Sequence, residues 1–145
     1  MTADESDALL SRLPHRPPML WIDEVTEVGP GRIVTRTTLR PGFLALRPDG
    51  TASGLIAIEI LAQAAAALFA ARVTEGPTSA MQGALLGTPR LDVHVPGFQV
   101  GDVLSAEVTE SWGAGSLSQL DGALRRGGEV VARGAINVAA RLTSG

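Results

Sequence analysis

The run from Ser53 to Val73, SGLIAIEILAQAAAALFAARV, constrains the fold more than any other part of this chain. Ala and Leu dominate it, and they are among the strongest helix formers. The sequence therefore predicts one long helix, with Ser53 as the N-cap because its hydroxyl can accept a hydrogen bond from a first-turn amide. Gly76-Pro77 follows the run and is expected to stop the helix.

Between Gly54 and Ala71 the only strongly polar side chains are Glu59 and Gln63. A helix that is apolar on nearly every side has to be buried. Its length alone would allow a membrane span, which needs about 20 apolar residues. The many small Ala residues and the carboxylate argue against a lipid-facing helix. We expect a helix buried inside a protein core, and no membrane association.

Glu59 and Gln63 are four residues apart and so lie on one face of the helix. A carboxylate on a buried helix is rare unless it is paired or functional. Two interpretations remain open at this point. Glu59 is either a structural residue satisfied by a neighbour across a subunit interface, or a catalytic base activated by desolvation.

Length and composition exclude several classes of protein. A chain of 145 residues predicts a single domain over 1–145, with residues 1–8 flexible. No Cys and two His leave no thiol nucleophile and too few ligands for a zinc site, so we expect no metal and no cofactor. A net charge of -3 argues against nucleic-acid binding. The start, MTADESDALL, lacks the features of a signal peptide and predicts a cytoplasmic protein.

The rest of the chain is typical of strands. Alternating or β-branched runs separated by Gly and Pro predict two strands before the helix and three or four after it. Strands segregated from one helix indicate an α+β fold, with an antiparallel sheet wrapped around one long central helix. The open edges of such a sheet favour dimerisation.

Four segments resemble the hotdog-fold 3-hydroxyacyl-acyl-carrier-protein dehydratases, in the right order and nearly from end to end. They are LPHRPPMLWIDEV, GLIAIEILAQAAAAL, VPGFQVGDVLSAEV and GEVVARGAINV. The resemblance implies a hotdog fold and a hydro-lyase that acts on acyl thioesters in fatty-acid, aryl-polyene or polyketide-type biosynthesis.

One family motif is missing. In the fatty-acid dehydratases a catalytic His stands in an HFPG motif nine residues before the Gly that opens the helix. Counting back from Gly54 lands on Ala45, and no His lies between Phe43 and Gly54. This loop and the later LLGTPR segment are more similar to the small dehydratase-like proteins of aryl-polyene and related polyketide clusters.

The resemblance and the chemistry together indicate the candidate residues. Dehydration needs a base for the α-proton and an acid for the departing hydroxyl. Glu59 can fill either role, and His15, in the opening motif, is the candidate partner. His15 could instead be structural, His94 is a weaker candidate, and a different subunit could supply the His. A helix amino end can stabilise negative charge on the thioester oxygen. The candidate substrate-binding residues are Ser53, Gly54, Leu55 and Gln63.

The resemblance also implies partners. The substrate would arrive on the phosphopantetheine arm of an acyl carrier protein or as a coenzyme A thioester. Carrier proteins are acidic, and Arg12, Arg16 and Arg90 are the candidate docking residues. Hotdog sites use two chains, so we expect a homodimer or a heterodimer. Two other functions stay open: an acyl thioesterase that uses the helix Glu, and a non-catalytic subunit that partners a His-bearing dehydratase.

Overall fold

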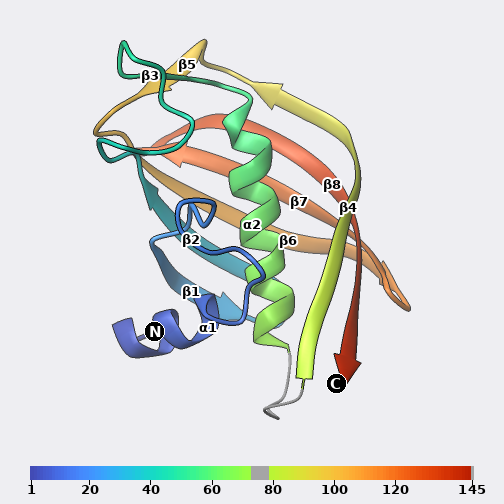
Figure 1. Ribbon diagram of the computed structural model, residues 1–145. Coiled ribbons are helices and arrows are strands. Elements are labelled where there is room, and N and C mark those ends of the chain that lie inside the picture. The colour runs from blue at the N-terminus through green and yellow to red at the C-terminus, as the bar shows by residue number, and fades with distance from the viewer. Residues whose placement is uncertain (73–78, 145) are drawn as a thin grey trace.

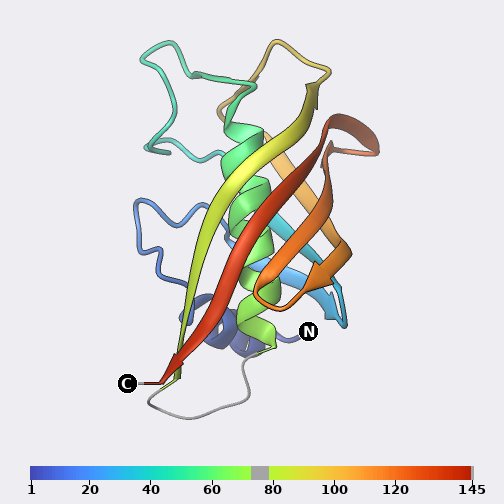
Figure 2. The same ribbon diagram turned by 90° about the vertical axis from the view of Figure 1, so that its right-hand side faces the viewer.

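The computed structural model describes residues 1–72 and 79–144. One long helix, α2 (Ile56–Ala71), runs along the inside of a curved antiparallel sheet, as Figures 1 and 2 show from two sides. The strands in spatial order are β1 (Glu24–Gly29), β2 (Arg32–Thr38), β6 (Val103–Ala114), β7 (Leu117–Arg126), β8 (Glu129–Ser144) and β4 (Ser79–Val93). A separate pair, β3 (Thr51–Ser53) and β5 (Gly97–Gln99), lies at the amino end of α2. The predicted α+β architecture is confirmed, but the short strands β3 and β5 add one strand before α2 and one after it that the sequence analysis did not predict.

Helix α2 begins later than the sequence predicted. Ser53 is the last residue of β3 rather than the N-cap, and its hydroxyl accepts a hydrogen bond from the Leu55 N–H at 3.1 Å. Leu55 is the N-cap and offers no side-chain bond. The expected last residue and stop signal, Val73 and Gly76-Pro77, lie outside the described residues. Among the residues that the structure describes, neither helix has the length and hydropathy of a membrane span.

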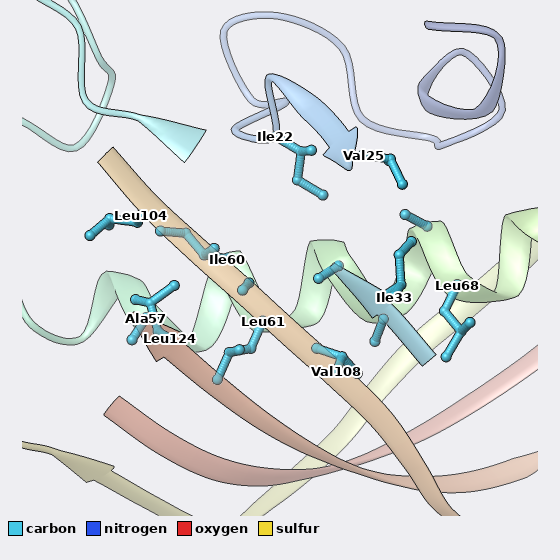
Figure 3. Packing of buried hydrophobic residues seen from close by; sticks show 14 of the residues in the cluster. Ile22, Val25, Ile33, Ala57, Ile60, Leu61, Leu68, Leu104, Val108 and Leu124 are labelled. Carbon is cyan, nitrogen blue, oxygen red and sulfur yellow. The ribbon is translucent and has the colours of Figure 1, made fainter. Parts of the chain in front are cut away.

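The core forms where α2 meets the sheet (Figure 3). Ile60, Leu61 and Leu68 of the helix are fully buried, and burying one such side chain stabilises the fold by about 1.5–3 kcal/mol. Gly122 of β7 lets the helix approach closely, since a Cβ there would lie 2.9 Å from Leu61 Cδ2. The predicted burial of α2 in a protein core is confirmed.

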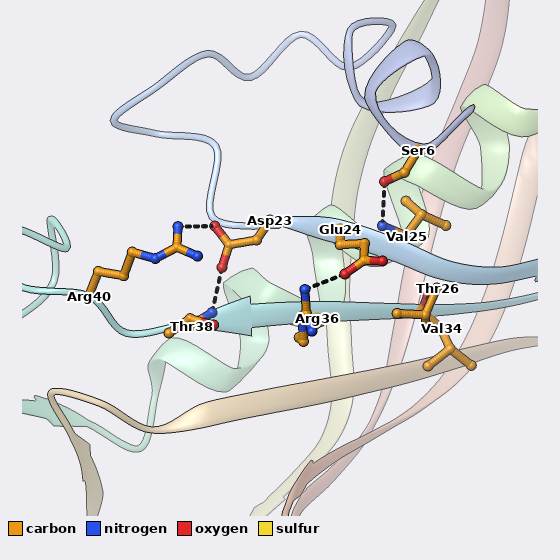
Figure 4. Close-up of polar contacts among 9 residues, drawn as sticks. All are labelled: Ser6, Asp23, Glu24, Val25, Thr26, Val34, Arg36, Thr38 and Arg40. Atoms are coloured by element: carbon orange, nitrogen blue, oxygen red, sulfur yellow. Dashed lines mark hydrogen bonds and ion pairs between the residues drawn. The ribbon is translucent and has the colours of Figure 1, made fainter. Parts of the chain in front are cut away.

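The amino-terminal segment differs from the expectation. Residues 1–8 were expected to be flexible, but helix α1 (Ala3–Leu10) begins there with a capping box that involves Thr2. Ser6 is buried, and its hydroxyl accepts a hydrogen bond from the Val25 N–H at 2.8 Å (Figure 4). Helix α1 is therefore attached to β1. Eight residues alone would be too short for a stable helix, so this contact decides their structure.

Asp23 closes the β1–β2 pair at one end (Figure 4). Its Oδ2 accepts a hydrogen bond from the Thr38 N–H at 2.6 Å, and its Oδ1 lies 3.5 Å from Arg40 Nη1. An ion pair between Glu24 and Arg36 crosses the same two strands. These contacts hold the point at which the chain leaves the Pro-rich opening motif and enters the sheet.

An ion pair attaches the carboxyl end of α2 to the sheet and predicts a pH dependence of stability. Arg72 Nη1 and Nη2 each donate to the Glu110 carboxylate at 3.1 Å, and Ser118 Oγ donates to the same carboxylate. The hydrogen bonds from Arg72 are the main cause of a lowered pKa of Glu110, with Ser118 adding to it.

Because Glu110 has a lower pKa in the folded chain than in the unfolded one, its stabilising effect is present above its ordinary value of 4.5 and is lost as the pH falls through the folded value. Arg72→Gln should lower the free energy of unfolding near neutral pH by up to about 1 kcal/mol. Urea denaturation should show this difference shrinking in acid. Arg133→Gln, on an exposed position of β8, is the control. A difference that stays constant with pH would contradict the assignment.

Candidate functional site

The opening motif places His15 through contacts of its neighbours. Leu13 and Ile22 are buried and anchor the two ends of this segment in the core. Between them the chain folds around Arg16, whose guanidinium donates hydrogen bonds to the carbonyl oxygens of Ser11, Leu13 and His15. The backbone at His15 is therefore held by a charged side chain from the same loop.

His15 and Glu59 come together in the structure. Glu59 lies in the first turn of α2, and its Oε1 is 3.7 Å from His15 Nε2. The His15 side chain is 26% exposed and that of Glu59 is 38% exposed. Glu59 was predicted to be buried, so this is a correction: its side chain is partly exposed rather than enclosed in the core. His15 Nδ1 is buried and has no hydrogen-bond partner among the described residues.

Gln63 lies behind this pair and is only 1% exposed. Its side-chain nitrogen donates to Glu59 Oε1 and to the Met19 carbonyl oxygen, both at 2.9 Å, and its side-chain oxygen accepts from the Trp21 N–H at 2.8 Å. The expected contact with substrate is therefore corrected: this amide is engaged by the protein and links the helix to the opening motif.

An aromatic pair next to this network was missed by the sequence analysis. The ring centroids of Trp21 and Phe43 are 4.9 Å apart, with the rings tilted by 57°. Trp21 Nε1 is buried without a hydrogen-bond partner among the described residues. No spacing signal could have found this pair, because the two rings come from separate segments that only the fold brings together.

The amino end of α2 also differs from expectation. A Cβ on Gly54 would lie 2.7 Å from Val93 Cγ1 and 3.2 Å from the Val95 carbonyl oxygen, so packing within the chain already requires glycine here. The Leu55 N–H is bonded to Ser53 Oγ, and the Leu55 side chain is 67% exposed. The Leu55 amide is thus occupied, and the Gly54 amide remains the candidate donor to a substrate oxygen.

The other histidine lies elsewhere. His94 is exposed just after β4, and its Nδ1 is 3.3 Å from the Val130 carbonyl oxygen. Within the described chain no group of three or more His, Asp or Glu side chains is arranged to hold a metal ion.

The candidate docking arginines have different surroundings. Arg12 Nη1 lies 3.4 Å from the Ala70 carbonyl oxygen, and the guanidinium of Arg16 serves the opening motif. Arg90 is 63% exposed and lies 3.4 Å from Asp92. A cavity of about 530 Å³ beside β3 and β5 has two further arginines, Arg47 and Arg126, in its lining.

The family model described as ApeP-like, ApeP dehydratase, matches residues 8–143. No curated protein matches the chain.

Solved structures with the same fold include functionally diverse proteins. A chain of the dehydratase heterocomplex ApeI:P from Xenorhabdus doucetiae is 24% identical, with a TM-score of 0.79 over 90% of this chain and 89% of that one. A sigma28-regulated virulence protein from Campylobacter jejuni is 12% identical, with a TM-score of 0.70 over 97% and 92%. The phenylacetic acid degradation protein PaaI from Thermus thermophilus is 22% identical, with a TM-score of 0.61 over 80% and 90%. These likenesses show the hotdog fold.

Proposed function

The chain belongs to the ApeP-like dehydratase family, and on that premise we propose that it removes water from 3-hydroxyacyl thioesters carried by an acyl carrier protein. The observation that carries this proposal is the approach of His15 Nε2 to within 3.7 Å of Glu59 Oε1 in one chain. The pair supplies a proton acceptor and a proton donor although the HFPG histidine is absent. Both side chains keep exposed surface through which a substrate can reach them.

The proposed reaction needs two proton transfers. The Glu59 carboxylate takes the α-proton, and the electron pair of that C–H bond forms the α,β double bond. The β-carbon–oxygen bond breaks, and protonated His15 gives its proton to the departing hydroxyl, which leaves as water. Glu59 then gives its proton to water and His15 takes a proton from water, which restores both groups. The Gly54 amide, at the positive end of α2, is the candidate donor to the thioester oxygen.

The carrier would be recognised by charge. Acyl carrier proteins are acidic, so exposed cations near the amino end of α2 would favour their approach. Arg47 and Arg126 line the cavity beside β3 and β5 and supplement Arg90. Arg126 is paired with Asp102 at 3.1 Å and Arg90 lies 3.4 Å from Asp92, while Arg16 is engaged within its own loop. The acyl group would belong to fatty-acid, aryl-polyene or polyketide-type synthesis.

A second hotdog subunit is also proposed. Strand β4 ends the six-stranded sheet, and edge strands readily pair with another chain. The matched structure from Xenorhabdus doucetiae is described as a heterocomplex. A homodimer or a heterodimer through β4 is therefore expected, and the non-catalytic subunit remains the second candidate function.

The test uses the purified protein with a 3-hydroxyacyl-carrier protein and mass spectrometry of the acyl group. Loss of water by the protein alone supports the dehydratase. Release of the free acid would indicate a thioesterase. Dehydration that requires an added second hotdog subunit, and that continues when this chain carries Glu59→Gln, would indicate a non-catalytic subunit.

His15→Gln should lower the dehydration rate by about 10²–10⁴-fold, because general acid catalysis contributes effects of this size. His94→Gln is the matched control, since the His94 side chain is exposed and its ring nitrogen Nδ1 lies next to the Val130 carbonyl oxygen rather than next to Glu59. Single-turnover kinetics compares the two variants. Equal rates for His15→Gln and the wild type would remove His15 from the reaction.

A further inference from the structure

The three hydrogen bonds of Gln63 allow only one orientation of its amide. The side-chain nitrogen faces two acceptors, Glu59 Oε1 and the Met19 carbonyl oxygen, and the side-chain oxygen faces one donor, the Trp21 N–H. Turning the amide over would bring oxygen against two oxygens and nitrogen against an N–H group. Both N–H donors of the amide are used, and its oxygen is bonded to a backbone donor.

The same network distinguishes the two oxygens of Glu59. The two polar contacts that Glu59 makes within the described chain, from Gln63 and from His15, both end on Oε1. Because both contacts fall on Oε1, Oε2 is the oxygen whose lone pairs have no partner in the described chain, and we expect a proton accepted by the carboxylate to bind there.

We propose that Gln63 is the positioning residue of the His15–Glu59 pair: it holds Oε1 toward His15 and leaves Oε2 to take the proton from the substrate. The orientation of Oε1 toward His15 concerns the protein alone, and the uptake of the substrate proton by Oε2 rests on the proposed dehydration.

Gln63 positions both members of the pair. One of its N–H groups holds the Glu59 carboxylate, while its other two bonds hold the backbone at Met19 and Trp21, on the segment that carries His15. At 1% exposure these bonds are shielded from competing water. Loss of this one side chain should therefore change the distance between His15 and Glu59, because both the carboxylate and the segment that carries His15 lose a hydrogen-bond partner.

NMR of the histidine rings tests the positioning without any substrate. The chain has two His, so its ring-proton spectrum is simple, and His94→Gln assigns the signals. Gln63→Met keeps an unbranched side chain but removes all three bonds. Gln63→Glu keeps the shape but can supply at most one of the two donors. In both variants the His15 signal should move and the His94 signal should stay.

Thr37→Val is the matched control, since Thr37 is fully buried and its hydroxyl has no partner among the described residues. Neither His signal should move far in it. If Gln63→Met fails to fold, Gln63→Glu decides the question. An unchanged His15 signal in a folded Gln63 variant would overturn the positioning role.

Kinetics tests whether the positioning by Gln63 matters for the proposed dehydration. Residues that orient a reacting group affect activity by about 10–100-fold, and we expect a fall of this size in kcat for Gln63→Glu with little change in KM. A rise in KM alone would show a substrate contact and overturn the proposal. If the wild type does not dehydrate but the His15 signal moves, the proposed function fails while the positioning by Gln63 stands.

Discussion

Replacing Glu59 by glutamine should reduce dehydration by about 10²–10⁴-fold, because an amide cannot take the α-proton. The fold should survive. Glutamine is nearly isosteric with glutamate, the Glu59 side chain is 38% exposed, and its amide oxygen can still accept the hydrogen bond from Gln63. The loss should appear in kcat, since the missing group acts in the transition state.

Single-turnover dehydration of a 3-hydroxyacyl-carrier protein measures this effect, with circular dichroism to verify folding. Glu27→Gln is the matched control, because Glu27 is 62% exposed on β1 and its ion pair is with Arg32 on the neighbouring strand. The control should keep the wild-type rate. Unchanged turnover in Glu59→Gln would remove Glu59 as the base and leave this chain as a subunit that supports a partner's site.

Gly97→Ala should destabilise the protein by about 1–3 kcal/mol, the usual cost of forcing an extra carbon into a packed region. A Cβ on Gly97 would lie 2.5 Å from the carbonyl oxygen of Ala52, a backbone atom that cannot rotate away. Gly97 pairs with Ser53 across the β3–β5 ladder. The clash therefore acts on the residues that lead directly into Gly54 and the start of α2.

Urea denaturation measures this change, and Gly128→Ala is its matched control, because a Cβ on Gly128 would meet nothing within 4 Å. The control should stay within a few tenths of a kcal/mol of the wild type. We also expect slower dehydration by Gly97→Ala under conditions in which it stays folded, because β3 sets the position of the Gly54 amide. Equal stability of the two variants would show that β3 can move away at little cost.

Local contacts explain why some sequence predictions were wrong. Ser53 has the chemistry of an N-cap, but pairing with Gly97 places it in β3, and its hydroxyl bonds to the Leu55 N–H before the helix starts. The first eight residues look like a polar tail, yet Ser6 bonds to Val25 and attaches α1 to β1. In both cases the deciding partner lies far along the chain, where local propensity carries no information.

The site was predictable only in part. The spacing of Glu59 and Gln63 places them on one face of the helix, and this holds because helix geometry is local. Their roles were not given by spacing. The carboxylate of Glu59 keeps exposed surface, whereas Gln63 is buried and bonded to Met19 and Trp21, which lie over 40 residues earlier in the chain.

The sequence by itself determined the long apolar helix and, in chain order, the strands of the six-stranded sheet but not the short β3–β5 pair, because periodicity and turn residues act over a few neighbouring positions. These features are enough to specify a sheet wrapped around α2. Only the tertiary structure decided that His15 and Glu59 meet at 3.7 Å. Their approach depends on the buried ends of the opening motif and on the three bonds of Gln63, which form when distant segments pack against the same helix.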